Sequence, residues 1–133
     1  MKLLNNFFLY QYPKQFETIF TITTLEIAFE NKLLRQLCES EVKAKRDLGV
    51  KIAERLKRRL ADFRAATCVK DLVAGRPREI DGARYRHMAI DLCESYYIVF
   101  CANHTATPIG ESGDVDWSKV RRIKILRIES NHG

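Results

Sequence analysis

Two consecutive stretches in the last third of the chain constrain its fold most strongly. Residues 85–92 alternate in character, and after a tight turn at Glu94-Ser95 the run from Tyr96 to Ala102 is rich in aromatic and β-branched residues. The alternation places on one face Met88, Ile90 and Leu92, and on the other face Tyr85, His87, Ala89 and Asp91. Two such stretches around a short turn predict a β-hairpin whose second strand lies inside a sheet.

Two further strands are predicted, one near the beginning and one at the end of the chain. Leu25, Ile27 and Phe29 alternate with polar or small residues, which is the period of a strand with one buried face. The stretch from Arg121 to Ile128 has similar β-branched character. Between this stretch and the hairpin, the segment from His104 to Asp116 contains a proline and two glycines and is expected to form a loop.

Two helices are predicted between the first strand and the hairpin. Asn31 is the expected N-cap of the first helix and Gly49 its stop signal. The first helix has apolar positions at steps of three and four residues: Leu34, Leu37, Cys38 and Val42. The second helix, from about Val50 to Ala66, has its own apolar stripe: Ile52, Leu56, Leu60 and Phe63. Residues 74–78 follow as a turn-rich connector. This order predicts an α+β domain in which an antiparallel sheet packs against two N-terminal helices.

The length of the chain fits a single domain, expected to span residues 25–133. The chain has 133 residues, and a hydrophobic content of 46% is enough to bury one core. We expect residues 1–24 to be an extension that is poorly ordered or loosely docked on the domain. It could also result from a translation start upstream of the true one. The run from Thr18 to Thr24 also suits an extra strand. Asn5 and Asn6 interrupt the N-terminal apolar run, which argues against a signal peptide or a membrane span.

The chain is basic, with a net charge of +6 and a pI near 9.3. This balance favours a polyanionic partner such as nucleic acid or an acidic protein segment, although a small protein can also simply carry excess charge. The second predicted helix has a basic face: Lys51, Arg55, Arg58 and Arg59. Such a face either binds nucleic acid or is a solvated surface whose aliphatic stems cover apolar neighbours.

The four cysteines do not form a metal-binding or disulfide pattern. Cys38, Cys68, Cys93 and Cys101 are widely spaced, without a Cys-x-x-Cys pair or a histidine at ligand spacing. Cys93 and Cys101 are the one pair that the predicted hairpin would bring onto neighbouring strands. We therefore expect reduced cysteines in a cytoplasmic protein, with no metal and no small-molecule cofactor.

Arginines are frequent around the hairpin and in the last predicted strand. They are Arg76, Arg78, Arg84, Arg86, Arg121, Arg122 and Arg127. If the strands pair in chain order, these guanidinium groups would lie across one side of the sheet, where they suit bidentate contact with phosphates. The sequence thus predicts a phosphate-binding surface.

His132, one residue from the C-terminus, is the candidate proton-transfer group. Cleaving RNA without a metal needs a base for the 2′-hydroxyl, cations for the developing charge and an acid for the leaving oxygen. An imidazole titrates around pH 6.5 and can serve as acid or base, while Tyr97 or Tyr85 can donate a hydrogen bond or stack on a base. The alternative is that a terminal histidine is frayed, that His87 is structural and that His104 is a loop residue.

Taken together, these residues resemble the RelE/ParE superfamily of bacterial toxins, most closely its HigB-like branch of plasmid-maintenance killer proteins. In the first part of the chain the matching features are Glu26-Ile27-Ala28-Phe29, Lys32 to Cys38 and Arg55-Leu56. In the second part they are Gly82, Ala89-Ile90-Asp91-Leu92, Tyr96 to Phe100, Asp116 to Val120, Ile125-Leu126-Arg127-Ile128 and His132. The resemblance covers residues 25–132 and leaves out only the N-terminal extension.

The resemblance implies a RelE-like fold and a toxin that cuts messenger RNA on the ribosome and is neutralised by a HigA-like helix-turn-helix antitoxin. His132 matches the terminal histidine that is implicated in catalysis in the family, Arg84 a basic hairpin residue and Arg76 a basic residue just before it. We therefore expect His132, Arg84 and Tyr97 to be catalytic. The expected phosphate-binding residues are Arg76, Arg78, Arg86 and Arg122.

The chain also departs from the branch pattern. Arg78 replaces a histidine before the hairpin, Asp81 a hairpin lysine and Tyr97 a strand arginine, while Ser130 and Asn131 replace an acid and a tyrosine before the final histidine. Each lost charge-assisted contact is worth about 1.5 to 3 kcal/mol. The alternative is therefore a slow or inactive member that binds the antitoxin or acts on another target, such as gyrase.

Overall fold

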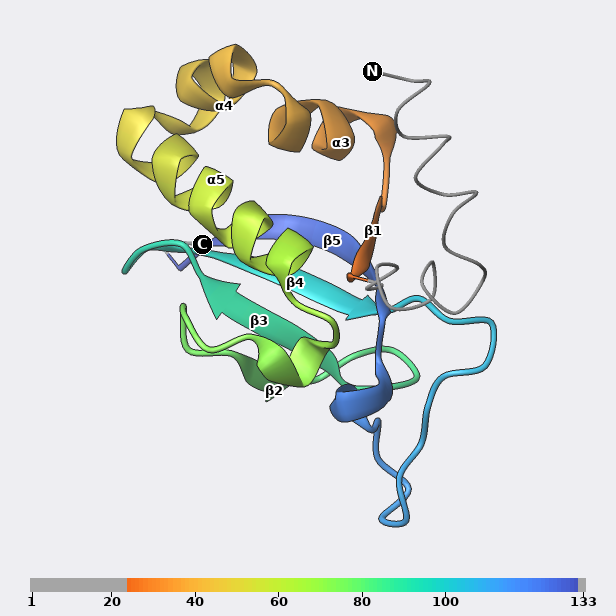
Figure 1. The fold of residues 1–133 in the computed structure, drawn as a ribbon. Helices are drawn as coiled ribbons and strands as arrows, with labels where there is room; N and C mark the ends of the chain where they lie inside the picture. The colour runs from red at the N-terminus through yellow and green to blue at the C-terminus, as the bar shows by residue number, and fades with distance from the viewer. Residues whose placement is uncertain (1–23, 132–133) are drawn as a thin grey trace, which may run out of the picture.

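The computed structural model describes residues 24–131, which form one five-stranded sheet with helices over one of its faces (Figure 1). The strands are β1 (Glu26–Phe29), β2 (Arg78–Ile80), β3 (His87–Asp91), β4 (Tyr96–Ala102) and β5 (Arg122–Ser130). The helices are α3 (Lys32–Glu39), α4 (Glu41–Leu48) and α5 (Val50–Ala65), with short 3₁₀ turns at Val69–Asp71 and Trp117–Lys119. The α+β class is as expected, while the predicted extension and His132 lie outside the described residues, apart from Thr24.

The sheet is mixed, so the prediction of an antiparallel sheet is wrong. Its order is β1-β5-β4-β3-β2, and β2 to β5 pair antiparallel with their neighbours. β1 pairs in parallel with β5, from Glu26 opposite Arg122 to Phe29 opposite Ile125. The chain leaves β1 through the helices and reaches β5 only after the β2–β4 meander. An alternating pattern gives the faces of a strand but not the direction of its partner.

The first predicted helix is in fact two, because the chain bends at Ser40. Ser40 has extended dihedral angles, ends α3 and caps α4, since its hydroxyl oxygen accepts a hydrogen bond from the Lys43 backbone N–H at 3.1 Å. The bend takes Val42 off the predicted apolar stripe and leaves it 78% exposed. Asn31 caps α3 as expected, through a 2.9 Å bond to the Leu34 N–H. The segment between β1 and β2 therefore holds three α-helices, not two.

The main core lies between α5 and the sheet. Phe63 of α5 meets Phe100 of β4 edge to face, with ring centroids 5.2 Å apart. The largest buried side chains in this layer are Leu56, Leu60, Phe63, Ile90, Ile98, Phe100, Ile123 and Ile125. All four cysteines, including Cys93 and Cys101, are free. No described helix is long and apolar enough to cross a membrane.

The connector predicted at residues 74–78 holds the start of a strand. Residues 78–80 form β2, which pairs with β3 at the edge of the sheet. The strand was missed because it is short and follows Pro77, without an alternating pattern of its own. Its first residue, Arg78, is thereby fixed on the sheet.

Candidate functional site

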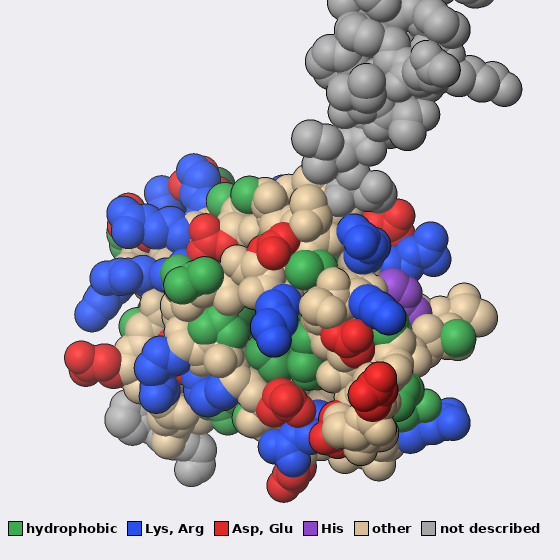
Figure 2. Space-filling view, turned by 60° about the horizontal axis from the view of Figure 1, so that its bottom comes forward, with side chains coloured by type: hydrophobic (Ala, Val, Ile, Leu, Met, Phe, Trp, Pro, Cys, Tyr) green, Lys and Arg blue, Asp and Glu red, His purple; other side chains and the backbone are tan. Residues whose placement is uncertain are grey.

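Two rows of side chains cross the face of the sheet opposite the helices. The first row follows the strand register from Arg78 through Ala89 and Val99 to Arg127, so two arginines flank two small residues. Ala89 and Val99 are fully buried although they do not belong to the helix-side core, which places them on the opposite face. The second row is Asp91, Tyr97 and Glu129. Figure 2, in which the bottom of the view in Figure 1 is turned forward, shows basic and acidic side chains interspersed around apolar ones.

Asp91 is paired with two arginines at one end of these rows. Its Oδ2 accepts from Arg76 Nε at 2.6 Å and its Oδ1 lies 3.1 Å from Arg78 Nη1. The Asp91 side chain is 19% exposed. Burial alone would raise the pKa of this carboxyl, but the hydrogen bonds from Arg76 and Arg78 outweigh it, and the pKa lies below its usual value. Asp91 is therefore an ionised group held by two guanidinium groups.

Tyr97 and Glu129 form a second pair at the other end. The Tyr97 hydroxyl donates to Glu129 Oε2, and Arg127 Nε donates to Glu129 Oε1. The hydrogen bond to Glu129, together with burial, raises the pKa of Tyr97. The hydrogen bonds from Tyr97 and Arg127 lower the pKa of Glu129. Tyr97 thus stays protonated beside an ionised carboxylate.

An arginine joins the two pairs into one network. The Arg78 guanidinium carbon lies 5.7 Å from the centre of the Tyr97 ring, within the range of a cation–π contact. Three arginines (Arg76, Arg78 and Arg127) face two carboxylates, which leaves one net positive charge. We call these five residues and Tyr97 the sheet-face cluster. Such a cluster suits an anion, but its arginines already have anionic partners.

A turn with unusual backbone geometry places Arg76 in the sheet-face cluster. Gly75 has a φ of 85° and Arg76 a φ of 51°, so two consecutive residues adopt left-handed conformations. The Gly75 carbonyl oxygen accepts a 2.6 Å hydrogen bond from the Asp91 N–H. A Cβ at Gly75 would lie 2.5 Å from Ile90 Cγ2 and 2.8 Å from the Asp91 carbonyl oxygen. Only glycine fits this turn without displacing β3.

The other predicted arginines lie outside the sheet-face cluster. Arg84 stacks on Tyr85, with 5.2 Å from its guanidinium carbon to the ring centre. Arg86 pairs with Glu79 at 3.0 Å and with Asp81 at 3.6 Å. Arg122 pairs with Glu26 at 3.2 Å, at the opposite end of β5 from Glu129. Seven residues of strand correspond to roughly 23 Å. The structure thus brings together Arg76, Arg78 and Tyr97, but not Arg84, Arg86 or Arg122.

The two described histidines have structural surroundings. Nε2 of His104 accepts from the backbone N–H groups of Arg121 and Arg122 at 2.9 and 3.2 Å. Burial lowers the pKa of His104, and the charges of Arg122 and Arg121 lower it further against the opposing effect of Glu26. Burial, followed by the charge of Arg127, also lowers the pKa of His87, whose Nδ1 is buried without a hydrogen-bond partner among the described residues. Both rings are neutral near pH 7.

The position of His132 itself is not described, but the residue before it is anchored. The Asn131 N–H donates to the Ser95 carbonyl oxygen at 2.6 Å, and its Nδ2 donates to the Glu94 carbonyl oxygen at 2.7 Å. These two bonds tie the end of β5 to the β3–β4 turn. The described chain therefore ends beside the strand ends that carry Asp91 and Tyr97.

Sequence reasoning did not select Asp91, Arg127 and Glu129 as site residues. The alternation in β3 did place Asp91 on the same face as Ala89, and Arg127 was one of the arginines of the last strand. The partnership of Tyr97 with Glu129 depends on the β4–β5 register, which shifts at an irregularity between Val99 and Phe100. Counting from the sequence alone does not reveal that shift.

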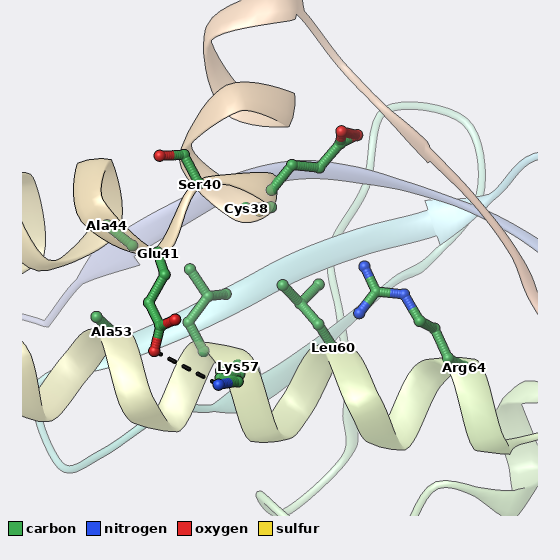
Figure 3. Close-up of a pocket in the computed structure, with 10 residues that line it drawn as sticks. Cys38, Ser40, Glu41, Ala44, Ala53, Lys57, Leu60 and Arg64 are labelled. Carbon is green, nitrogen blue, oxygen red and sulfur yellow. Dashed lines mark hydrogen bonds and ion pairs between the residues drawn. The ribbon is translucent and has the colours of Figure 1, made fainter.

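A cavity lies on the helical side, away from the sheet face that carries the sheet-face cluster. It has a volume of about 490 Å³ and lies between the α3–α4 bend and α5 (Figure 3). Glu41 and Lys57 pair across it at 3.4 Å, and Arg64 lies near its far end. Burial raises the pKa of the Cys38 thiol to about 11, so this lining group is protonated and a poor nucleophile.

Within residues 24–131, no group of three or more His, Cys, Asp or Glu side chains is arranged to hold a metal ion. No protein-family model, curated protein or solved structure matches the chain.

Proposed function

We propose that the chain is a toxin of the RelE/ParE type, HigB-like, that cuts messenger RNA on the ribosome in the cytoplasm. A HigA-like helix-turn-helix antitoxin would neutralise it. The support is the resemblance of residues 25–132 together with the sheet-face cluster. One observation carries the proposal: Arg76, Arg78 and Tyr97, chosen as site residues from the sequence, lie together on the uncovered face of the sheet.

The proposed reaction needs no metal. A base takes the proton of the 2′-hydroxyl, whose oxygen bonds to phosphorus while the bond to the 5′-oxygen breaks, and an acid protonates that leaving oxygen. The products are a 2′,3′-cyclic phosphate and a 5′-hydroxyl. Guanidinium groups stabilise the charge that develops on the phosphoryl oxygens.

The residues of the chain supply these roles as follows. Arg78 and Arg76 bind the phosphate. The Tyr97 hydroxyl is kept protonated by its hydrogen bond to Glu129, and it donates to the RNA only after leaving that partner. His132, which follows the anchored Asn131, is the proposed proton-transfer group. Arg84, on the loop between β2 and β3, remains a catalytic candidate through the resemblance alone, and Arg86 and Arg122 remain candidates for more distant RNA phosphates.

One observation favours a second function. Asp91 and Glu129 already neutralise most of the sheet-face cluster, which weakens any phosphate site there. A catalytically weak or inactive member that binds the antitoxin, or that acts on another target such as gyrase, would have this property. Tight binding to the helix-turn-helix product of a neighbouring gene, without RNA cleavage on ribosomes, would support this second function.

Inducible expression in bacteria tests the first proposal. The wild-type protein should arrest growth and cleave translated messages, and Arg78→Gln or His132→Ala should relieve the arrest at equal protein level. Arg46→Gln is the matched control, since it removes one positive charge from α4. There Arg46 forms an ion pair with its neighbour Asp47. A wild-type protein that is harmless and leaves translated messages intact would refute the nuclease.

A further inference from the structure

The Asp91 carboxylate is bound as an oxyanion ligand would be. Its two oxygens are taken by different arginines, Oδ2 by Arg76 at 2.6 Å and Oδ1 by Arg78 at 3.1 Å. Guanidinium N–H groups donate to phosphate oxygens through the same kind of charge-assisted contact. The pair of arginines therefore forms a complete two-point anion site whose occupant is a side chain of the protein.

We propose that Asp91 occupies the phosphodiester site of Arg76 and Arg78 in the free protein, so that a phosphate of single-stranded RNA must displace it. The inference rests on the proposed function, because it assigns the RNA-phosphate site to this pair of arginines. Asp91 is then an affinity-setting residue that keeps the free protein a weak RNA binder.

The contacts leave Arg76 free to move to a phosphate, while they hold Arg78 and Asp91 in place. The Arg76 side chain is 76% exposed, so it can swing from Asp91 to an incoming phosphate without unpacking the core. Arg78 is held against the Tyr97 ring and by a 3.1 Å bond from its Nη1 to the Arg76 carbonyl oxygen. Asp91 lies on a strand and cannot follow Arg76, since its N–H is tied to Gly75.

No other cation of the sheet-face cluster is positioned to replace the lost partner. Arg127 is engaged with Glu129, on the other side of Tyr97. RNA binding would therefore leave Asp91, only 19% exposed, without Arg76 and sharing Arg78 with the phosphate. An uncharged isostere at residue 91 removes this penalty and frees both arginines.

The test is a binding titration of the full-length protein with a fluorescent single-stranded RNA carrying 2′-O-methyl groups, which cannot be cleaved. Asp91→Asn should tighten binding about tenfold, equivalent to about 1.4 kcal/mol. It should also steepen the dependence of log K on log salt by about 0.7 for each phosphate gained. Asp91→Ser repeats the test if the amide variant does not fold.

Asp47→Asn is the matched control, because it removes the same charge and frees one arginine, Arg46, on α4 instead of on the sheet. It should change affinity less than threefold, roughly the effect of one exposed pair. Adding Arg76→Gln and Arg78→Gln to Asp91→Asn should abolish the gain. Equal effects of Asp91→Asn and Asp47→Asn, or no gain from Asp91→Asn, would overturn the inference.

This titration is independent of the nuclease proposal. Tighter binding by Asp91→Asn together with a harmless wild-type protein would support the displacement of Asp91 by RNA and refute the proposed nuclease activity. Growth arrest by the wild type, together with unchanged RNA binding by Asp91→Asn, would support the nuclease activity and refute the displacement of Asp91.

Discussion

Replacing Gly75 with alanine should destabilise the domain by about 2–5 kcal/mol. A left-handed conformation costs an alanine about 1–2 kcal/mol, and Gly75 has a φ of 85°. The new Cβ would also lie 2.5 Å from Ile90 Cγ2 and 2.8 Å from the Asp91 carbonyl oxygen, and such overpacking costs roughly 1–3 kcal/mol. A domain of this kind has about 5–15 kcal/mol of total stability, so the loss is large.

Gly113→Ala separates the two contributions. Gly113 has nearly the same φ, 86°, but nothing lies within 4 Å of the position of its Cβ. This variant should therefore lose only the conformational part, about 1–2 kcal/mol. Urea unfolding followed by the fluorescence of Trp117, the one tryptophan of the chain and a buried one, measures both. Losses that agree within about 0.5 kcal/mol would refute the close approach of Gly75 to β3.

Three further results are expected. Stability should fall as the pH drops below about 6.5, the unfolded pKa of His104, because burial lowers the folded pKa of this group and its contribution to stability is complete only above the unfolded value. His104→Gln should make this slope shallower in urea titrations, and an unchanged slope would contradict the prediction. Tyr97→Phe, which leaves Glu129 without its hydroxyl donor, should cost about 1 kcal/mol in the same assay, and a stability equal to wild type would count against that bond. The affinity of the proposed antitoxin should weaken as salt rises from about 0.05 to about 0.5 M, and an affinity indifferent to salt would remove the charge argument.

The sequence predicted elements whose patterns are local. The alternation of residues 85–92 and the β-branched run from Tyr96 to Ala102 correspond to β3 and β4, and the predicted helix from Val50 to Ala66 matches α5 almost residue for residue. In each case one face must be buried, and the period of the buried residues differs between strand and helix. Such patterns need no knowledge of the partner element.

The features that the sequence did not predict depend on distant parts of the chain. The parallel pairing of β1 with β5 joins segments that are about 95 residues apart, and neither segment encodes the direction of its partner. The bend at Ser40 depends on one cap hydrogen bond between two segments that both favour helix. The site also depends on contacts between distant parts of the chain. Arg76 and Arg78 were chosen by residue type, whereas no local pattern marked their partner Asp91.

The most direct test of the proposed RNA-cleaving site is primer extension on a message engaged on purified ribosomes and incubated with the purified protein. We expect cuts within the ribosome-bound region that leave 5′-hydroxyl ends. Arg78→Gln and His132→Ala should slow these cuts by about tenfold or more, which corresponds to about 1.4 kcal/mol in the activation barrier, while Arg46→Gln should cleave like the wild type. Absence of cleavage, or cleavage that Arg78→Gln leaves unchanged, would contradict the assignment of the uncovered sheet face as the catalytic surface.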